Sequence, residues 1–171
     1  MNIKDFIRDM PDFPKPGILF RDISPLLADP RTYRYVIDQF YERYKNQSID
    51  LIIGIESRGF LFASTLAYKL ELPLAMVRKH GKLPPPTVFY EYALEYGNDK
   101  IELPSNAIHP GNYVLLIDDL LATGGTALAS CHLIEKMGGK ILEIATVIEL
   151  GFLNGREQLK DYKVFSQTVY D

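Results

Sequence analysis

Two adjacent carboxylates, Asp118 and Asp119, stand between a run of apolar residues and a loop of small residues. The apolar run, residues 114–117, is typical of a strand buried on both faces, so the acids are expected where that strand emerges into solvent. The loop that follows lets the backbone approach a ligand closely at the positive end of a helix, and it consists of Ala122, Thr123, Gly124, Gly125 and Thr126. Such a loop predicts a phosphate-binding site.

The loop differs from the two common nucleotide-binding patterns. No Gly-Lys-Ser/Thr sequence ends it, and the Gly-x-Gly-x-x-Gly spacing is missing, which disfavours a nucleoside triphosphate or a dinucleotide. Ionised Asp accepts hydrogen bonds from hydroxyl groups, so the pattern suits a ligand with a phosphate at one end and vicinal hydroxyls at the other, such as ribose 5-phosphate. A surface turn with solvated acids is the alternative.

At these residues the chain resembles the type I phosphoribosyltransferases, whose motif for phosphoribosyl pyrophosphate (PRPP) joins an apolar strand, an acidic pair and an Ala-Thr-Gly-Gly-Thr loop. Further segments narrow the resemblance to the adenine phosphoribosyltransferase family, and they lie in that family's order along nearly the whole chain. They are PDFPKPGILFRDISPLL (11–27), GIESRGFLF (54–62), VRKHGKLP (77–84) and YALEYG (92–97). The resemblance implies transfer of a phosphoribosyl group from PRPP to adenine, giving AMP and pyrophosphate.

Length and composition favour one domain that binds small molecules. A chain of 171 residues is long enough for a single sizeable core. Its 22 acids, 19 bases and net charge of −3 argue against a nucleic-acid-binding surface. Cys131 is the only cysteine, which excludes an internal disulfide, favours a packed thiol and is consistent with a cytoplasmic location. Charged residues interrupt every apolar run, so neither a signal peptide nor a membrane span is expected.

Alternating strand and helix patterns predict an α/β fold with a mostly parallel central sheet flanked by helices. Strands are expected at residues 51–55, 74–77, 114–117 and 141–148, and helices at residues 30–45, 59–70 and 125–137. Residues 84–104 fit neither pattern, and their alternation predicts a protruding hairpin of the kind that often acts as a lid. The resemblance implies the type I phosphoribosyltransferase fold, with a hood over about residues 1–28 and a lid over about residues 84–104.

Ser57 and Arg58 follow the first core strand, so they are expected at the same sheet edge as the acids. The resemblance makes this the pyrophosphate loop and implies a cis peptide bond between Glu56 and Ser57. An Arg beside a Gly at a strand end is a fair anion site, although an ordinary surface ion pair is the alternative.

A second basic group follows the next strand and contains Arg78, Lys79 and Lys82. The resemblance assigns it to pyrophosphate binding and implies that Arg78 reaches the neighbouring subunit's site in a homodimer. From the sequence alone, a solvated basic turn fits equally well. The chain departs from the family here, because Pro85-Pro86 follows Lys-Leu-Pro where relatives commonly carry Gly or Arg, and this restricts the hinge of the expected lid.

Glu95 is the candidate catalytic base, because the attacking nitrogen of a purine loses a proton as the glycosidic bond forms. Motif identity favours this role over that of a solvated strand Glu. Arg58 is expected to assist catalysis by stabilising the leaving pyrophosphate. Tyr92 and Tyr96 are expected to pack or to close the lid.

The adenine site is assigned to Leu19, Phe20 and Arg21 by resemblance. Phe20 is expected to stack on the base, an interaction that does not discriminate between bases. The backbone of Leu19 is expected to select adenine through hydrogen bonds to the edge of the base. Phe20 as core filler is the alternative. Mg²⁺ is the expected cofactor, held mainly by substrate and water, because no His or Cys has the spacing of a zinc site.

Two rival functions stay open at this level. One is a phosphoribosyltransferase for another purine, such as a 6-oxopurine. The other is a PRPP-binding regulator without catalysis, although the chain lacks the basic face that a DNA-binding regulator needs. A phosphoryl-accepting receiver fits poorly because the acidic pair occurs late in the chain and Gly-Gly-Thr follows it.

Overall fold

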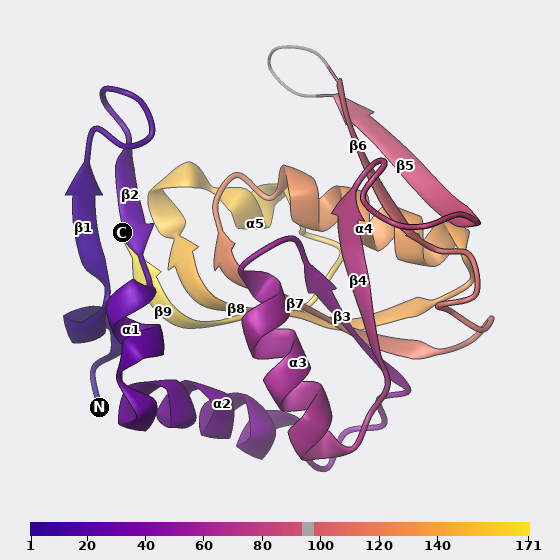
Figure 1. Cartoon of the computed structure of the whole chain (residues 1–171), viewed down its shortest axis with the longest axis horizontal. Coiled ribbons are helices and arrows are strands. Elements are labelled where there is room, and N and C mark those ends of the chain that lie inside the picture. Colours follow the sequence, from indigo (N-terminus) through magenta and orange to yellow (C-terminus); the bar gives the residue numbers. More distant parts are fainter. Residues whose placement is uncertain (94–97) are drawn as a thin grey trace. The chain divides into compact units, whose positions relative to one another are not determined.

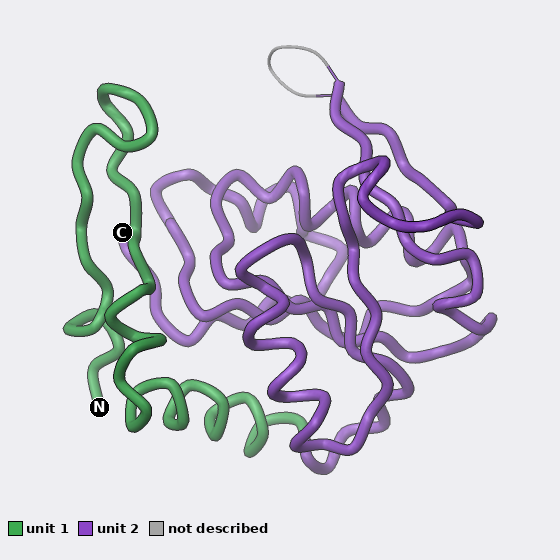
Figure 2. The backbone as a smooth tube through the Cα atoms, in the orientation of Figure 1, with its two compact units in different colours: residues 1–44 green, residues 45–171 purple. Residues whose placement is uncertain are grey.

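The computed structural model describes residues 1–93 and 98–171. It divides into two compact units, residues 1–44 and residues 45–171, which Figure 2 shows in different colours. The expected hood belongs to the first unit and the expected lid to the second. That the chain acts as one domain stays a prediction.

The first unit combines a short hairpin with helices. Strands β1 (Arg8–Pro11) and β2 (Leu19–Asp22) pair antiparallel, after the 3-10 helix η1 (Ile3–Phe6) and before helix α1 (Ser24–Ala28). Helix α2 (Pro30–Tyr44) begins after Asp29, whose Oδ1 accepts hydrogen bonds from the backbone N–H groups of Arg31 and Thr32 at 2.8 and 3.2 Å. This side-chain cap, followed by proline in the first turn, explains the helix start and confirms the expected helix.

The second unit contains a seven-stranded sheet in the order β5-β6-β4-β3-β7-β8-β9 (Figure 1). Strands β4, β3, β7, β8 and β9 run parallel, and β6 is antiparallel to both β4 and β5. The strands are β3 (Leu51–Ile55), β4 (Leu74–Lys79), β5 (Thr87–Ala93), β6 (Asn98–Pro104), β7 (Tyr113–Leu121), β8 (Lys140–Leu150) and β9 (Val164–Tyr170). The mostly parallel α/β sheet is confirmed.

Helices α3 (Gly59–Leu70) and α4 (Gly125–Lys136) cover opposite faces of this sheet. Odd-numbered residues of β3 share a buried cluster with α4, whereas Gly54 faces α3, because a Cβ on it would lie 2.8 Å from the Cβ of Ala63. Burial on both faces explains the unbroken apolar runs of β3 and β7. Cys131 is buried in α4, as expected. The remaining helices are η2 (Gly151–Leu153) and α5 (Gly155–Gln158). No helix in the described residues has the length and apolar character needed to span a bilayer.

The strand boundaries correct the sequence-based expectation in several places. The predicted strand 74–77 continues to Lys79, so Arg78 and Lys79 lie within β4 and the expectation that they follow the strand is wrong. The predicted strand 114–117 continues to Leu121, because β8 stays paired beside it as far as Glu149. The acidic pair therefore lies within β7, and the expectation that the strand ends before Asp118 is wrong. Strands β1, β2 and β9 were not predicted.

The expected hairpin is confirmed as β5 and β6, which pair from Thr87 opposite Pro104 to Ala93 opposite Asn98. It is part of the central sheet, since β6 also pairs with β4.

Candidate active site

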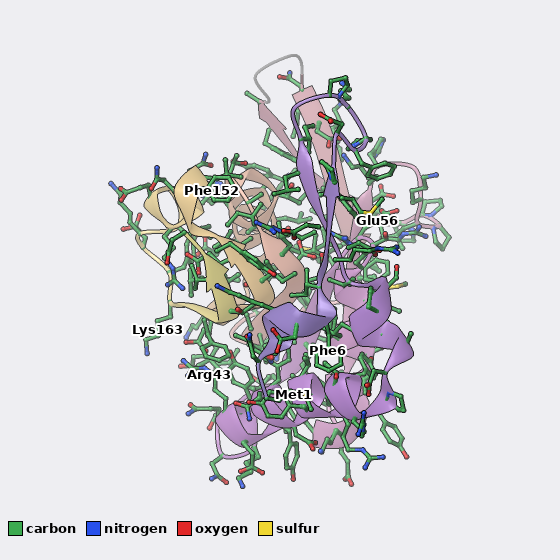
Figure 3. The ribbon with its side chains drawn as sticks, turned by 90° about the vertical axis from the view of Figure 1, so that its left-hand side faces the viewer. Met1, Phe6, Arg43, Glu56, Phe152 and Lys163 are labelled. Carbon is green, nitrogen blue, oxygen red and sulfur yellow. The ribbon has the colours of Figure 1, made fainter. Side chains whose placement is uncertain are left out.

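The carboxyl ends of β3, β4 and β7 meet at one edge of the sheet. Gly54 of β3 lies opposite Ile117 of β7, and Ile55 lies opposite Val77 of β4. The residues that follow these positions are therefore neighbours in space: Glu56 and Ser57, Arg78 and Lys79, and Asp118 and Asp119. Beyond Ile117, β7 has a strand partner only on its β8 side among the described residues, which opens the acidic pair toward the loop after β3. In Figure 3, the label on Glu56 marks this edge.

The small-residue loop lines a pocket of about 150 Å³ together with Asp118 and Glu56. All five predicted loop residues contribute to its wall: Ala122, Thr123, Gly124, Gly125 and Thr126. Gly124 is the N-cap of α4 with φ +89°, a conformation that favours glycine. Among the described residues no side chain caps this helix, and Gly125, Thr126 and Ala127 of its first turn line the pocket, so the uncapped N–H groups of that turn are available to an anion.

The acidic pair is far less exposed than a surface turn would be. Asp119 is 5% exposed, and its Oδ2 lies 2.8 Å from Nη2 of Arg58. Burial raises the pKa of Asp118 well above its usual range, and the charge of Asp119 raises it further. Burial also raises the pKa of Asp119, against the opposing effect of the Arg58 guanidinium. Hydroxyl groups that donate to these oxygens would stabilise the ionised forms.

Gly59 lets the start of α3 approach the acidic pair closely. A Cβ on Gly59 would lie 2.8 Å from Oδ1 of Asp118 and 2.9 Å from the carbonyl oxygen of Ile117. Arg58, the residue before the helix, is thereby brought next to Asp119.

The loop after β3 has the predicted cis peptide bond between Glu56 and Ser57. The carboxylate of Glu56 connects this loop to the end of β4: its Oε1 accepts from Nη2 of Arg78 at 3.1 Å, and its Oε2 accepts from the N–H of Lys79 at 2.6 Å. Burial opposes ionisation of Glu56, but these donors lower its pKa. The loop that carries Arg58 is thus in contact with the end of β4, which carries Arg78.

The basic turn after β4 is fixed by a buried acid, Glu102, which is 1% exposed. Its Oε1 accepts from the N–H groups of Lys82 and Leu83 at 3.1 and 2.9 Å, and its Oε2 lies 3.0 Å from Nδ1 of His80. Burial opposes ionisation of Glu102, but these hydrogen bonds lower its pKa. The turn is therefore an organised structure and not simply a solvated loop.

The hairpin of β5 and β6 reaches both α4 and the phosphate loop. Oη of Tyr90 lies 2.9 Å from Nδ1 of His132, and Nζ of Lys136 donates to the carbonyl of Phe89 at 3.1 Å. Oη of Tyr92 lies 3.4 Å from Oγ1 of Thr126. Lys79 of β4 forms an ion pair with Asp99 of β6. The other two hairpin candidates, Glu95 and Tyr96, lie outside the described residues.

The three predicted adenine-site residues lie in β2 of the first unit. The ring of Phe20 meets that of Phe13 edge to face, with centroids 5.1 Å apart, and both line an apolar pocket of about 230 Å³. Leu19 is 45% exposed, and Arg21 forms an ion pair with Asp9. The aromatic pocket has a size and character that suit a flat ring.

Sequence reasoning missed several residues of the second unit's site. Glu56, Glu102 and Thr146 received no role, although Glu56 and Thr146 line the pocket and Glu102 holds the basic turn. Glu102 lies in β6 and Glu56 directly follows β3, and acidic residues at such positions are usually solvated, so only their place opposite basic groups in the fold reveals their roles.

Comparisons with known proteins agree with this geometry. A family model described as a phosphoribosyl transferase domain matches residues 22–170. The adenine phosphoribosyltransferase of Chloroflexus aurantiacus is 53% identical over 165 residues, which cover 96% of this chain and 95% of the relative.

Solved structures of relatives have the same fold. The adenine phosphoribosyltransferase of Thermoanaerobacter pseudethanolicus matches with a TM-score of 0.95 at 46% identity, over 98% of both chains. The enzyme of Saccharomyces cerevisiae, crystallised with adenine and an imino-altritol bisphosphate, matches with a TM-score of 0.91 at 41% identity, over 97% of this chain and 96% of the relative. The chain belongs to the adenine phosphoribosyltransferase family.

Proposed function

We propose that this chain transfers the phosphoribosyl group of PRPP to adenine and releases pyrophosphate, forming AMP. The observation that carries the proposal is the pocket in which the phosphate loop at the start of α4 stands beside Asp118. The yeast relative, whose structure contains adenine, supports the choice of base.

Each part of PRPP has a matching group at the carboxyl edge of the sheet. The 5-phosphate accepts hydrogen bonds from the backbone of residues 122–126, and Asp118 and Asp119 accept hydrogen bonds from the ribose hydroxyls. Binding energy from the phosphate, remote from the reacting carbon, positions that carbon for attack.

Pyrophosphate is assigned to two segments that Glu56 connects. Ser57 and Arg58 come from the loop after β3, whereas Arg78 and Lys79 come from the end of β4 and Lys82 from the turn that follows it. Arginine and lysine stabilise the negative charge that develops on the leaving group. No set of three or more His, Cys, Asp and Glu side chains suited to a metal occurs within residues 1–93 and 98–171, so Mg²⁺ would take most of its ligands from substrate and water. When bound, it would neutralise pyrophosphate charge.

Leu19, Phe20 and Arg21 are assigned to adenine binding. Glu95 is assigned as the base that accepts the proton from the attacking nitrogen of adenine. If Phe20 stacks on the base, Phe20→Ala should raise KM for adenine about 5- to 150-fold, which corresponds to about 1 to 3 kcal/mol. Glu95→Gln should lower kcat. Glu91→Gln is the matched control, because Glu91 is an exposed acid of the same hairpin.

The remaining parts of the proposal concern assembly and location. Residues 1–28 act as a hood and residues 84–104 as a lid, within one domain. The chain forms a homodimer, and exposed Leu61 and Tyr68 on α3 offer apolar surface for it. A cytoplasmic location is consistent with the single, buried cysteine. Light scattering on the purified protein tests the dimer.

A base panel tests the function. Purified protein is incubated with PRPP, Mg²⁺ and either adenine, hypoxanthine or guanine, and nucleotide is measured. AMP should form from adenine, with little product from the 6-oxopurines. Product mainly from a 6-oxopurine would identify the other base specificity, and no product from any base would point to a PRPP-binding regulator.

A further inference from the structure

A turn after β8, to which the proposed reaction assigns no role, packs against the phosphate loop. It comprises η2, whose Phe152 is labelled in Figure 3, then Asn154 with φ +53°, and the start of α5. A Cβ on Gly155 would lie 2.2 Å from the carbonyl oxygen of Ala122, and a Cβ on Gly124 would lie 2.6 Å from the carbonyl oxygen of Gly155. The two backbones are therefore in contact, and neither position has room for a side chain.

A bidentate ion pair holds this turn in place. Nε and Nη2 of Arg156 donate to Oε1 and Oε2 of Glu149, each at 2.7 Å, and Nη1 donates to the carbonyl of Val164 at 3.0 Å. Glu149 is 5% exposed. Two parallel hydrogen bonds fix orientation as well as distance, so α5 is anchored to both β8 and β9.

The same acid also lies beside the residue that precedes the phosphate loop. In the ladder between β7 and β8, Leu121 is paired with Glu149. The backbone of Glu149 thus fixes the start of the loop, and its side chain holds Arg156, next to Gly155, which touches the loop at Ala122 and Gly124. Residues 121–124 are therefore held at both ends, by the strand pairing of Leu121 and by the contacts of Gly155.

We propose that Gly155, held by the pair of Glu149 and Arg156, is a positioning residue that sets the backbone of residues 122–124 for the 5-phosphate of PRPP. The inference rests on the proposed function, which puts a phosphate at this loop. None of the three residues needs to touch the ligand. Affinity for ligands that carry the 5-phosphate should depend on the turn, whereas affinity for pyrophosphate, which binds at the loops after β3 and β4, should not.

Calorimetry on the full chain with two probes tests this separation. Ribose 5-phosphate reports on the phosphate loop, and inorganic pyrophosphate with Mg²⁺ reports on the other loops. Gly155→Ala and Glu149→Gln should weaken binding of ribose 5-phosphate about 10- to 100-fold, because a displacement of a positioned group by about 1 Å has effects of this size. Binding of pyrophosphate should stay at the wild-type level.

The control is Arg31→Gln, which removes an arginine from an exposed pair with Asp29 in the first unit. It should leave both affinities unchanged. If Gly155→Ala does not fold, Glu149→Gln, which keeps the shape of the side chain, and Arg156→Gln, which shortens it, decide the question. Wild-type affinity for ribose 5-phosphate in the folded variants overturns the inference, as does equal weakening of both probes, which would indicate a general structural role. Failure of the proposed function is distinguishable, because wild-type protein itself would then not bind ribose 5-phosphate.

Discussion

The close contact between Gly59 and the acidic pair predicts how much a side chain at position 59 would lower stability and raise KM for PRPP. In Gly59→Ala, the new Cβ would lie 2.8 Å from Oδ1 of Asp118 and 3.0 Å from its Cα. Relief of this contact requires a shift of ~0.7 Å, the difference between 2.8 Å and an unstrained separation of about 3.5 Å. The start of α3 and the end of β7 must therefore move apart, which displaces Arg58 and Asp118 relative to one another.

The expected cost has two parts. Overpacking of this kind destabilises proteins by about 1 to 3 kcal/mol, which for a chain of this length lowers the melting temperature by about 2 to 12 °C. Misplacement of the acidic pair should also raise KM for PRPP, by up to about 100-fold.

Thermal unfolding and initial rates of AMP formation measure the two parts in the same samples. Ser64→Ala is the matched control, because Ser64 is exposed on the same helix. Gly54→Ala creates a similar contact, 2.8 Å from the Cβ of Ala63, but away from Asp118, so it should lower stability with a smaller effect on KM. A Gly59→Ala protein with wild-type melting temperature and wild-type KM would refute the reasoning.

Three further predictions follow from buried acids. Burial, and then the charge of Asp119, raise the pKa of Asp118, so ionisation of Asp118 lowers the stability of the fold as the pH rises above about 4. Asp118→Asn should therefore raise the melting temperature of the ligand-free protein near neutral pH, and raise it by less at about pH 5. The same substitution should lower the rate of AMP formation. The Arg156 guanidinium lowers the pKa of Glu149, so this pair stabilises the fold above about pH 4.3, and the stabilisation is lost as the pH falls through the pKa of Glu149 in the folded protein. Glu149→Gln should therefore make the melting temperature depend less on pH in the acid range. Glu102→Gln should cost about 1.5 to 3 kcal/mol in denaturant unfolding and raise KM for PRPP, since the N–H groups of the basic turn then donate to a neutral acceptor in place of a carboxylate.

The sheet edge could be predicted from sequence because its local signals agree with the fold. The apolar run of β3 and the small residues after β7 each indicate a strand end or a helix start by themselves, and parallel strands bring such ends together. The helix starts at Gly59 and Gly125 coincide with the predicted ones.

The exposure of the acidic pair could not be predicted, because it depends on partners distant in sequence. β8 keeps β7 extended past Asp119, and Arg58 approaches from α3. The roles of Glu102 and Glu149 were missed for the same reason. An isolated strand Glu resembles a solvated residue, and only the assembled sheet shows that each faces a specific donor.

A crystal structure of the protein with AMP and pyrophosphate tests the central claim most directly. The account predicts the AMP phosphate within hydrogen-bond distance of the N–H groups of residues 123–126, with the ribose hydroxyls on Asp118 and Asp119. A well-defined nucleotide whose phosphate lies away from the N-terminus of α4, or whose ribose contacts neither aspartate, would contradict it.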